Sequence, residues 1–307
     1  MRKILISGLV NTETTVRVRQ FPVNYYPIDY PFFGVHTAVS GVAYNLARAM
    51  TTLGDEVALV SMTGRDFPAE SIRRELEAAG IGTEHLRATL RETPSSVVLY
   101  DGEGKRQIYC DLKDIQEARC DFDRDLCESA DLIAACNINF NRPLLAMAKA
   151  AGKPIATDVH VLTDIHDAYN RDFMACADIL FLSDEGIGWD YRGFLTALAQ
   201  TYGNRILVLG RGEKGAALYL REENRIYELP AVRVGEIVNT VGAGDALFSA
   251  FVHYFAGGLE PLEALIRAEL FASAKIGTSG ASEGFVTGEA VEALYQRYGK
   301  ALKNEVR

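Results

Sequence analysis

The sequence predicts an α/β fold in three layers, with a mostly parallel central sheet between two layers of helices. Along most of the 307 residues, short runs suited to strands alternate with segments of helical period. The short runs are nearly continuous in apolar residues, as strands buried on both faces are. Two interruptions of this alternation predict a second, smaller β-sheet.

The expected elements follow one another in a regular order. The strands are expected over Ile4–Ser7, Val57–Ser61, Leu132–Ala135, Ile155–Asp158, Ile179–Leu182 and Ile206–Leu209. The helices are expected over Val42–Leu53, Ala69–Ala79, Arg142–Ala151, Ile165–Ala175, Phe194–Tyr202, Gly244–Phe255, Pro261–Ile276 and Glu289–Leu302. Strands separated by helical crossovers are parallel, and the helices then cover both faces of the sheet.

The alternation breaks at Glu13–Val35 and again at Ser95–Tyr109. The first region contains the alternating run Thr-Thr-Val-Arg-Val-Arg, and the second contains Asp-Gly-Glu-Gly between two short apolar runs, a hairpin signal. Because ligands of open α/β sheets bind beyond the carboxyl ends of the strands, we expect a β lid there. The lid segments are about 13–37 and 93–112 of a single domain, 1–307.

The composition excludes several classes of protein. Apolar residues make up 48% and charged residues 24%, and the net charge of −9 argues against nucleic acid or an anionic membrane as a partner. No run reaches the roughly 18 apolar residues of a membrane span. The N-terminal apolar run is too short for a signal peptide, so we expect a cytoplasmic protein. The five cysteines contain no C-x-x-C pair, which argues against a zinc site.

The most informative stretch is Asn239-Thr-Val-Gly-Ala-Gly-Asp245, which leads directly into an apolar helix. The first amides of a helix have no intrahelical acceptor, so Gly242, Ala243 and Gly244 can present N–H groups to an anion. Asp245 lies in the first turn beside that anion and can take a proton from a hydroxyl that attacks phosphorus. The alternative is an acidic residue that complements the helix dipole, worth roughly 0.3–1 kcal/mol.

Polar residues near two other element ends suit a hydroxyl-rich ligand. Asn11 and Glu13 follow the first strand, and Asn45 lies one turn beyond Gly41 at the start of a helix. The alternative for Asn11 and Glu13 is a polar turn and a surface acid.

The string Gly210-Arg-Gly-Glu-Lys-Gly215 matches G-x-G-x-x-G. A dinucleotide site needs a helix after it, but Ala-Ala-Leu-Tyr-Leu-Arg reads as a strand, so the fingerprint fails on its context. A nicotinamide-dependent oxidoreductase would need that helix. A glycine loop between two strands can still lie against a nucleotide.

The order of these segments resembles the PfkB (ribokinase-like) carbohydrate kinase family, from about Ile4 to Leu302. Asn239–Asp245 resembles the family's D-T-x-G-A-G-D signature, and Ser40–Asn45 resembles its G-G-x-x-x-N helix, with Gly64-Arg-Asp66 downstream. Arg211–Gly215 resembles the family's nucleotide loop, and Ala272–Ala281 its late helix beside the adenine.

The resemblance implies a ribokinase-like fold, ATP and Mg²⁺ as co-substrate and cofactor, and in many members a response to a monovalent cation, for which K⁺ is the candidate. Asp245 is then the catalytic base, and Gly242, Ala243 and Gly244 form the anion hole. Asn11, Glu13, Gly41 and Asn45 map onto sugar-contacting positions. The positions that map near the nucleotide are Gly210, Arg211, Gly212, Gly215 and Ser273.

Several residues depart from the family pattern. Asn239 replaces the first Asp of the signature, and Ser40 replaces the first Gly of the G-G pair. Glu13 lies where the family usually has an Asp. The N-x-x-E element should fall near Ser183–Gly186, where neither residue is in place. Asp184 or Glu185 is the substitute for its magnesium role, and we take Glu185 as the candidate metal residue.

The expected function is ATP-dependent phosphorylation of a primary hydroxyl on a sugar or sugar-containing metabolite. The aromatic residues of the first ribbon would stack on a base if the acceptor were a nucleoside, or alternatively pack the lid or form a dimer contact. They are Phe21, Tyr25, Tyr26, Tyr30, Phe32 and Phe33. We expect a homodimer through the β lid. A non-catalytic sensor on a kinase scaffold is the other alternative.

Overall fold

The computed structural model describes residues 2–103, 105–188, 190–278 and 280–307. In this part of the chain, nine strands form the large sheet in the order β13-β12-β11-β10-β9-β8-β1-β4-β5. Their bounds are β1 Lys3–Ser7, β4 Glu56–Thr63, β5 Leu86–Ala88, β8 Leu132–Ala135, β9 Ile155–Val161, β10 Ile179–Ser183, β11 Ile206–Gly210, β12 Ala216–Leu220 and β13 Arg225–Leu229. The neighbouring strands β11, β10, β9, β8, β1, β4 and β5 pair in parallel. At one edge of the sheet, β12 pairs with β11 and β13 pairs with β12, both antiparallel.

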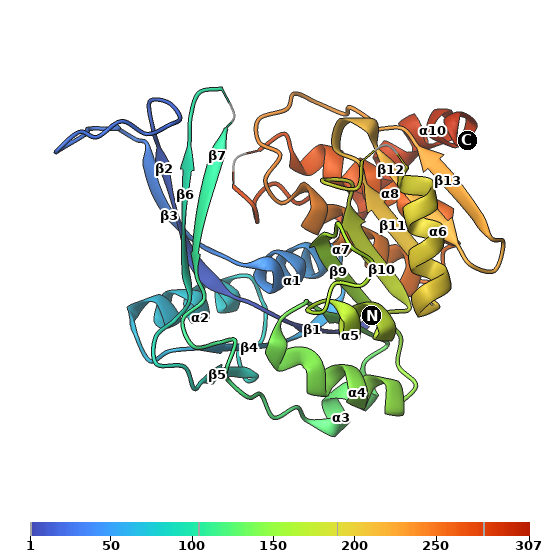
Figure 1. The fold of residues 1–307 in the computed structure, drawn as a ribbon, viewed down its shortest axis with the longest axis horizontal. Coiled ribbons are helices and arrows are strands. Elements are labelled where there is room, and N and C mark those ends of the chain that lie inside the picture. Colours follow the sequence, from blue (N-terminus) through green and yellow to red (C-terminus); the bar gives the residue numbers. More distant parts are fainter. Residues whose placement is uncertain (1, 104, 189, 279) are drawn as a thin grey trace.

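Helices cover both faces of this sheet, as the sequence predicts (Figure 1). One layer contains α1 Val42–Thr52, α2 Phe67–Ala78, α7 Ala243–Ala256, α8 Pro261–Lys275 and α9 Gly288–Leu294, followed by a π-helical turn Tyr295–Gly299 and α10 Lys300–Glu305. The other contains α3 Arg124–Ser129, α4 Arg142–Ala150, α5 Arg171–Cys176 and α6 Tyr191–Tyr202.

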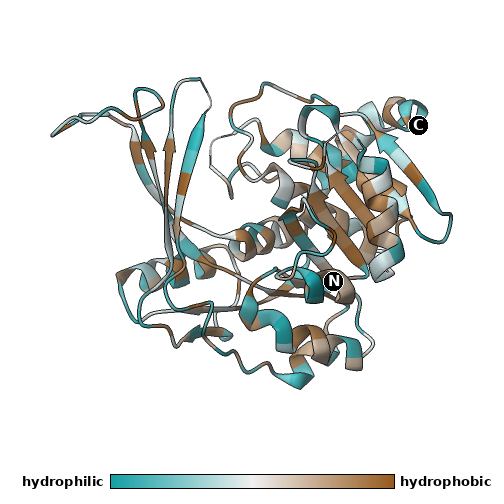
Figure 2. Ribbon diagram, viewed as in Figure 1, coloured by the Kyte–Doolittle hydropathy of each residue, from teal (hydrophilic) through white to brown (hydrophobic). Residues whose placement is uncertain are grey.

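The buried residues of each strand divide between two cores. In β1, Ile4 and Ile6 pack into one core, while Leu5 packs into the other. Successive side chains of a strand point to opposite faces, so a strand covered on both faces must be apolar at every position. Figure 2 shows this as hydrophobic strands in the middle of the molecule and hydrophilic residues on the outer helices and loops.

The helix expected over Ile165–Ala175 is much shorter in the structure, because α5 begins only at Arg171. The Asp164 carboxylate accepts a hydrogen bond from the His166 amide, and the Asp167 carboxylate accepts one from the Asn170 amide. These side-chain turns compete with the helical ladder and delay the start of the helix.

The predicted lid is a separate four-stranded sheet in the order β3-β2-β6-β7. Its strands are β2 Asn11–Arg17, β3 Val35–Ser40, β6 Ser95–Tyr100 and β7 Arg106–Asp111. Figure 1 shows this lid standing beside the larger body, with the loop between β2 and β3 extending outward. Of the predicted hairpin turn between β6 and β7, Gly104 lies outside the described residues.

Asp66 connects helix α2 to the base of the lid. Its carboxylate caps α2 by accepting from the Ala69 amide at 3.1 Å. It also accepts from the Thr93 amide at 2.8 Å and from the Thr93 hydroxyl at 2.5 Å, just before β6 begins. One side chain therefore fixes both a helix start and the entry of the chain into the lid.

We expect Asp66→Ala to lower the free energy of unfolding by about 2–3 kcal/mol, because it leaves a helix cap and two Thr93 donors without their acceptor. Asp190→Ala is the matched control. Asp190 caps α6, which has the same length, through one exposed hydrogen bond to the Gly193 amide. Its loss is expected to be about 1 kcal/mol. Urea unfolding measures both, and equal losses would contradict the account of Asp66.

Candidate active site

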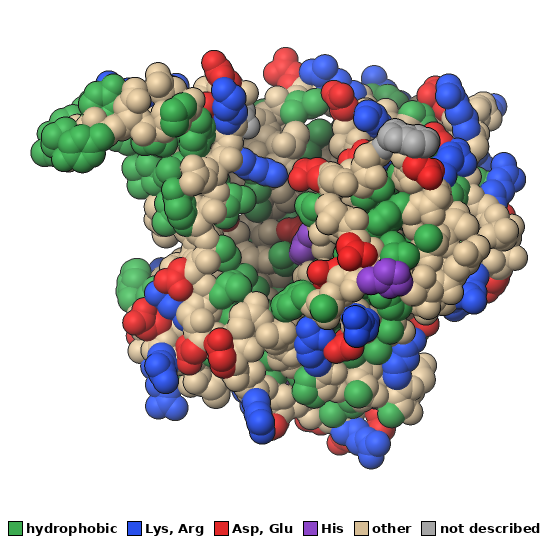
Figure 3. All heavy atoms as spheres, in the orientation of Figure 1, with side chains coloured by type: hydrophobic (Ala, Val, Ile, Leu, Met, Phe, Trp, Pro, Cys, Tyr) green, Lys and Arg blue, Asp and Glu red, His purple; other side chains and the backbone are tan. Residues whose placement is uncertain are grey.

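The candidate site lies where the lid meets the carboxyl ends of the parallel strands. Figure 3 shows the molecule hollowed between the lid and the larger body. Two helices begin at this hollow: α1 starts after Gly41, and α7 starts after Gly242. The packing of α1 against α7 brings residues 200 positions apart in the sequence into contact.

Asp245 lies in the first turn of α7, where its carboxylate Oδ2 accepts a hydrogen bond from Asn45 Nδ2 at 2.7 Å. A small cavity beside it is lined by Val42, Leu46, Ala135, Cys136, Asp158 and Phe248. Burial raises the pKa of Asp245, and the hydrogen bond from Asn45 opposes part of that rise. A carboxylate with a raised pKa is a better proton acceptor than one free in water.

The turn before Asp245 leaves several main-chain donors available. Gly242 has φ +78°, and a Cβ there would lie 2.4 Å from the Ala281 carbonyl oxygen, so the position requires glycine. The amides of Gly242, Gly244 and Asp245 have no acceptor among the described residues. The Ala243 amide differs from expectation, because it donates to the Thr240 carbonyl at 3.2 Å. The side chain of Asn239 holds the turn by accepting from the Val241 amide.

The predicted sugar positions are also brought together. Asn11 and Glu13 lie on the same face of β2, and Ser96 of β6 joins them. Asn11 Nδ2 donates to the Ser96 hydroxyl at 3.1 Å, and that hydroxyl donates to Glu13 at 3.4 Å. Burial raises the pKa of Glu13, with hydrogen bonds from Ser96 and Ser40 opposing the rise.

Three buried amide oxygens are without a donor in the described part of the chain, and two of them, Asn11 Oδ1 and Asn45 Oδ1, belong to the predicted sugar positions; the third is Asn204 Oδ1. A buried acceptor without a partner is unfavourable by about 1–3 kcal/mol, so both oxygens are suited to a ligand that brings hydroxyl donors. Gly41 contributes its backbone. Its φ is +105°, and a Cβ would lie 2.5 Å from the Leu9 carbonyl oxygen, which requires glycine at the start of α1.

The glycine loop lies between β11 and an antiparallel β12, so the dinucleotide fingerprint is excluded as the sequence predicts. Gly210 ends β11, and Gly212 begins a 3₁₀ turn with φ +53°. A Cβ on Gly215 would lie 2.1 Å from the Leu229 carbonyl oxygen, so only glycine fits there.

Two residues predicted near the nucleotide already have protein partners. The Arg211 guanidinium lies over the ring of Tyr191 and pairs with Glu228 at 3.4 Å. The Ser273 hydroxyl donates to the Val232 carbonyl at 2.7 Å and accepts from the Val234 amide at 3.1 Å. In this structure both side chains therefore hold protein segments in place.

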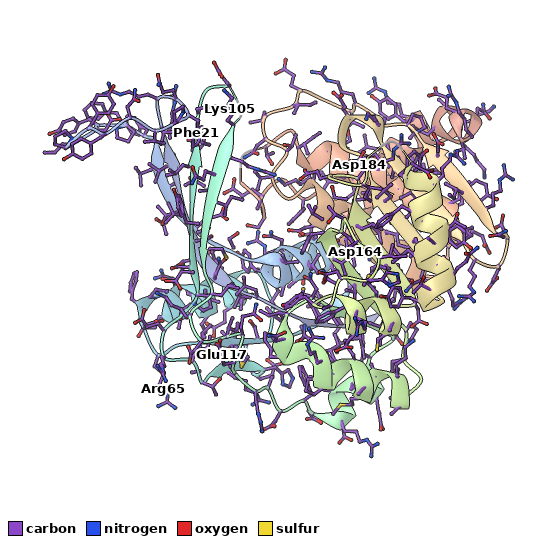
Figure 4. All side chains as sticks on the ribbon, viewed as in Figure 1. Phe21, Arg65, Lys105, Glu117, Asp164 and Asp184 are labelled. Carbon is purple, nitrogen blue, oxygen red and sulfur yellow. The ribbon has the colours of Figure 1, made fainter. Side chains whose placement is uncertain are left out.

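Glu185, the candidate metal residue, is exposed on the turn after β10. The turn adjoins the glycine loop, since the Asp184 amide donates to the Gly210 carbonyl at 3.0 Å. Figure 4 shows Asp184 on the larger body, with Phe21 and Lys105 on the lid. Among the described residues, no group of three or more His, Cys, Asp and Glu could hold a metal. Magnesium bound through phosphates needs only one or two carboxylates, which Asp184 and Glu185 can supply.

Three residues near Asp245 have no role predicted from the sequence: Asp158, His160 and Lys275. Asp158 lines the cavity beside Asp245, and its carboxylate accepts from the His160 amide at 2.7 Å. His160 has φ +57°, a conformation that residues other than glycine rarely adopt. A polar residue at the end of a buried strand was the available signal for Asp158. Lys275 is fully buried at the end of α8.

Comparison with known proteins identifies relatives across nearly the whole chain. The model of the pfkB family of carbohydrate kinases matches residues 1–287. Fructosamine kinase FrlD of Bacillus subtilis (strain 168) is 24% identical over 265 residues, covering 84% of this chain and 89% of its own length.

Solved structures give the same fold. The microbiome-derived acarbose kinase Mak1 has a TM-score of 0.84 at 24% identity, covering 96% of this chain and 99% of its own. A ribokinase of Arabidopsis thaliana complexed with ribose and ATP has a TM-score of 0.81 at 20% identity, with the same coverage. At these identities the superpositions establish the fold alone.

No helix in the described residues is long and apolar enough to cross a membrane.

Proposed function

Because the chain belongs to the pfkB family of carbohydrate kinases, we propose that it transfers the γ-phosphoryl group of ATP to a primary hydroxyl of a sugar or sugar-containing metabolite. The observation that carries this proposal is the Asp245 carboxylate, held by Asn45 beside three free amides at the start of α7. A base and an anion-binding turn at one point are the two parts that phosphoryl transfer requires.

Phosphoryl transfer at this site would form one bond to phosphorus and break another. The acceptor oxygen forms a bond to the γ-phosphorus as the bond to the β–γ bridging oxygen breaks, and ADP leaves with that electron pair. The hydroxyl proton passes to Asp245. The amides of Gly242, Gly244 and Asp245 donate to the phosphoryl oxygens, where negative charge is concentrated in the transition state. Asp184 or Glu185 would hold magnesium together with the phosphates, where the metal would supply neutralisation of the phosphate charge.

The sugar would lie against the lid side of the hollow. The unpaired amide oxygens of Asn11 and Asn45 can accept from its hydroxyls, and Glu13 can accept from another. Three hydrogen-bond acceptors on two elements favour a substrate with several hydroxyl groups. They do not distinguish a free sugar from the ribose of a nucleoside.

The lid aromatics bear on that choice. Tyr25 and Phe33 are 87% and 97% exposed in the outer loop between β2 and β3, whereas Asn11 lies at the opposite end of β2. Rings at the outer end of the lid are poorly placed to stack on a base beside Asn11. We therefore favour a sugar, and assign these rings to contact with a second copy of the chain.

A screen for ADP release tests the function. ATP and Mg²⁺ are supplied with pentoses, hexoses, phosphosugars and nucleosides, and we expect turnover with at least one sugar. Asp245→Asn should leave the melting temperature unchanged and lower turnover about 10²–10⁴-fold, the usual contribution of a positioned base. Asp125→Asn, at an exposed position in the first turn of α3, is the control and should retain turnover. Near-wild-type turnover of Asp245→Asn would remove it from this role, and ligand binding with no ADP release for any acceptor would favour a sensor.

The pH dependence of turnover provides a second test of Asp245. The base must be ionised, so turnover falls as the pH falls through its raised pKa. Asn45→Ala removes a donor that favours the charged form, and should move this acid limb to higher pH by about one unit, the equivalent of one hydrogen bond. The charges of Asp158, His160 and Lys275 also act on Asp245 and are unchanged. Asn11→Ala removes a side chain that donates to Ser96 and not to Asp245, so it should leave the limb in place even where it weakens acceptor binding. An unmoved limb in Asn45→Ala would contradict the assignment.

The proposed homodimer rests on apolar side chains of the lid. In addition to the outer loop, Val35, Ile108 and Tyr109 are more than half exposed on its strands. An isolated sheet with an exposed apolar face needs a covering surface, and a self-complementary contact between two lids supplies one.

Sedimentation velocity tests this contact. We expect the wild-type chain to sediment as a dimer, and Tyr25→Asp with Phe33→Asp to sediment as a monomer, because charge is introduced at the apolar surface. Phe67→Asp is the control, since Phe67 is 76% exposed but lies on α2 outside the lid. A wild-type monomer at all concentrations would refute the contact.

A further inference from the structure

Lys275 has no role in the site described above, yet it is fully buried beside the anion-binding turn. It is the last residue of α8, and its ammonium donates to the backbone carbonyls of Val241 and Gly280, at 2.7 Å for Gly280. Val241 directly precedes Gly242, and the segment after Gly280 packs against Gly242 through Ala281. The ammonium therefore joins the two backbone segments that shape the turn.

Peptide geometry gives this contact a direction. In a planar trans peptide, the C=O and the following N–H point in opposite directions. Because the Val241 carbonyl points at Lys275, the Gly242 amide of the same peptide points away from it, on the side of the unpaired donors. Lys275 thus orients one of the amides that the proposed reaction uses.

The ammonium remains the prevailing form at neutral pH. Burial lowers the pKa of Lys275 to about 8, while the charges of Asp245 and Glu283 oppose this fall. A buried positive charge close to Asp245 also favours an incoming phosphoryl group. A buried charge persists only where its hydrogen bonds are satisfied, here by carbonyl oxygens.

Converging backbone carbonyls are also the ligands with which proteins bind potassium. Here the carbonyls of Val241 and Gly280 are already occupied by a tethered cation. A second cation at the same oxygens would meet like charge, so K⁺ does not fit at this point of the structure. This conflicts with the monovalent-cation response that the family resemblance implies.

We propose that Lys275 is a positioning residue that takes the place of a dissociable monovalent cation. Its ammonium fixes the turn before α7 with the Gly242 amide directed at the transferred phosphoryl group. The proposal rests on the proposed kinase function and concerns the same site.

The first test compares cations. Wild-type turnover is measured in KCl and in choline chloride at equal ionic strength, with the acceptor found in the screen, and should agree within about twofold, since the tethered ammonium needs no replacement. Stimulation of the wild-type protein by K⁺ of tenfold or more would overturn the proposal.

The second test removes the ammonium. Lys275→Ala in choline chloride should lose about 10–100-fold in turnover, because the Gly242 donor is no longer fixed. K⁺, NH₄⁺ or methylammonium should restore part of it by entering the vacated space. Lys275→Met fills that space without charge, so it should be slow and insensitive to all three cations. Lys149→Ala, at the exposed last turn of α4, is the control with wild-type turnover.

A binding measurement separates this proposal from the kinase function itself. Calorimetry of ATP–Mg²⁺ should show weaker binding to Lys275→Ala in choline chloride and recovery in KCl, whether or not an acceptor is known. Wild-type turnover by Lys275→Ala without an added cation, or ATP binding indifferent to both the variant and K⁺, would overturn the role of Lys275. An absence of wild-type ADP release would count against the proposed function alone.

Discussion

The site depends on one electrostatic constraint at the start of α7. The turn before this helix leaves amides without acceptors, and the first turn carries the Asp245 carboxylate beside them. Amides that bind an anion and a carboxylate that repels one can lie side by side only if the position of the carboxylate is fixed. Asn45 does this by donating to Asp245 from a different helix. The packing of α1 against α7 is therefore part of the chemistry of the site.

The surrounding elements keep the turn in one conformation. Gly242 has a positive φ and close contact with Ala281, Asn239 accepts from the Val241 amide, and Lys275 binds the Val241 carbonyl. Each contact engages a different atom of the same few residues. A turn over-determined in this way can present its donors without reorganisation when the phosphoryl group arrives, which is the condition for electrostatic catalysis. We propose that the lid, with its chain of hydrogen bonds Asn11–Ser96–Glu13, binds the phosphate acceptor on the other side of the same hollow.

Much of this architecture was predictable from sequence, because apolar periodicity and glycine turns are local signals. The six predicted strands, the lid and the position of Asp245 in the first turn of its helix follow from such patterns. The predictions that failed depend on competing or distant partners. Side-chain turns at Asp164 and Asp167 shortened α5, and the Thr240 carbonyl engaged the Ala243 amide. One of the two carbonyls that Lys275 binds, that of Val241, lies 34 residues away in the chain, and no local pattern indicates this contact.

We propose that the amides of the turn and the Asp245 carboxylate act at one point in space. The most direct test of this proposal is a crystal structure of the protein with ADP, Mg²⁺, aluminium fluoride and the accepted sugar. We expect fluoride ligands within hydrogen-bond distance of the Gly242 and Gly244 amides, and Asp245 about 2.6–3.2 Å from the acceptor oxygen. A fluoride group bound away from this turn, with the sugar hydroxyl remote from Asp245, would contradict it.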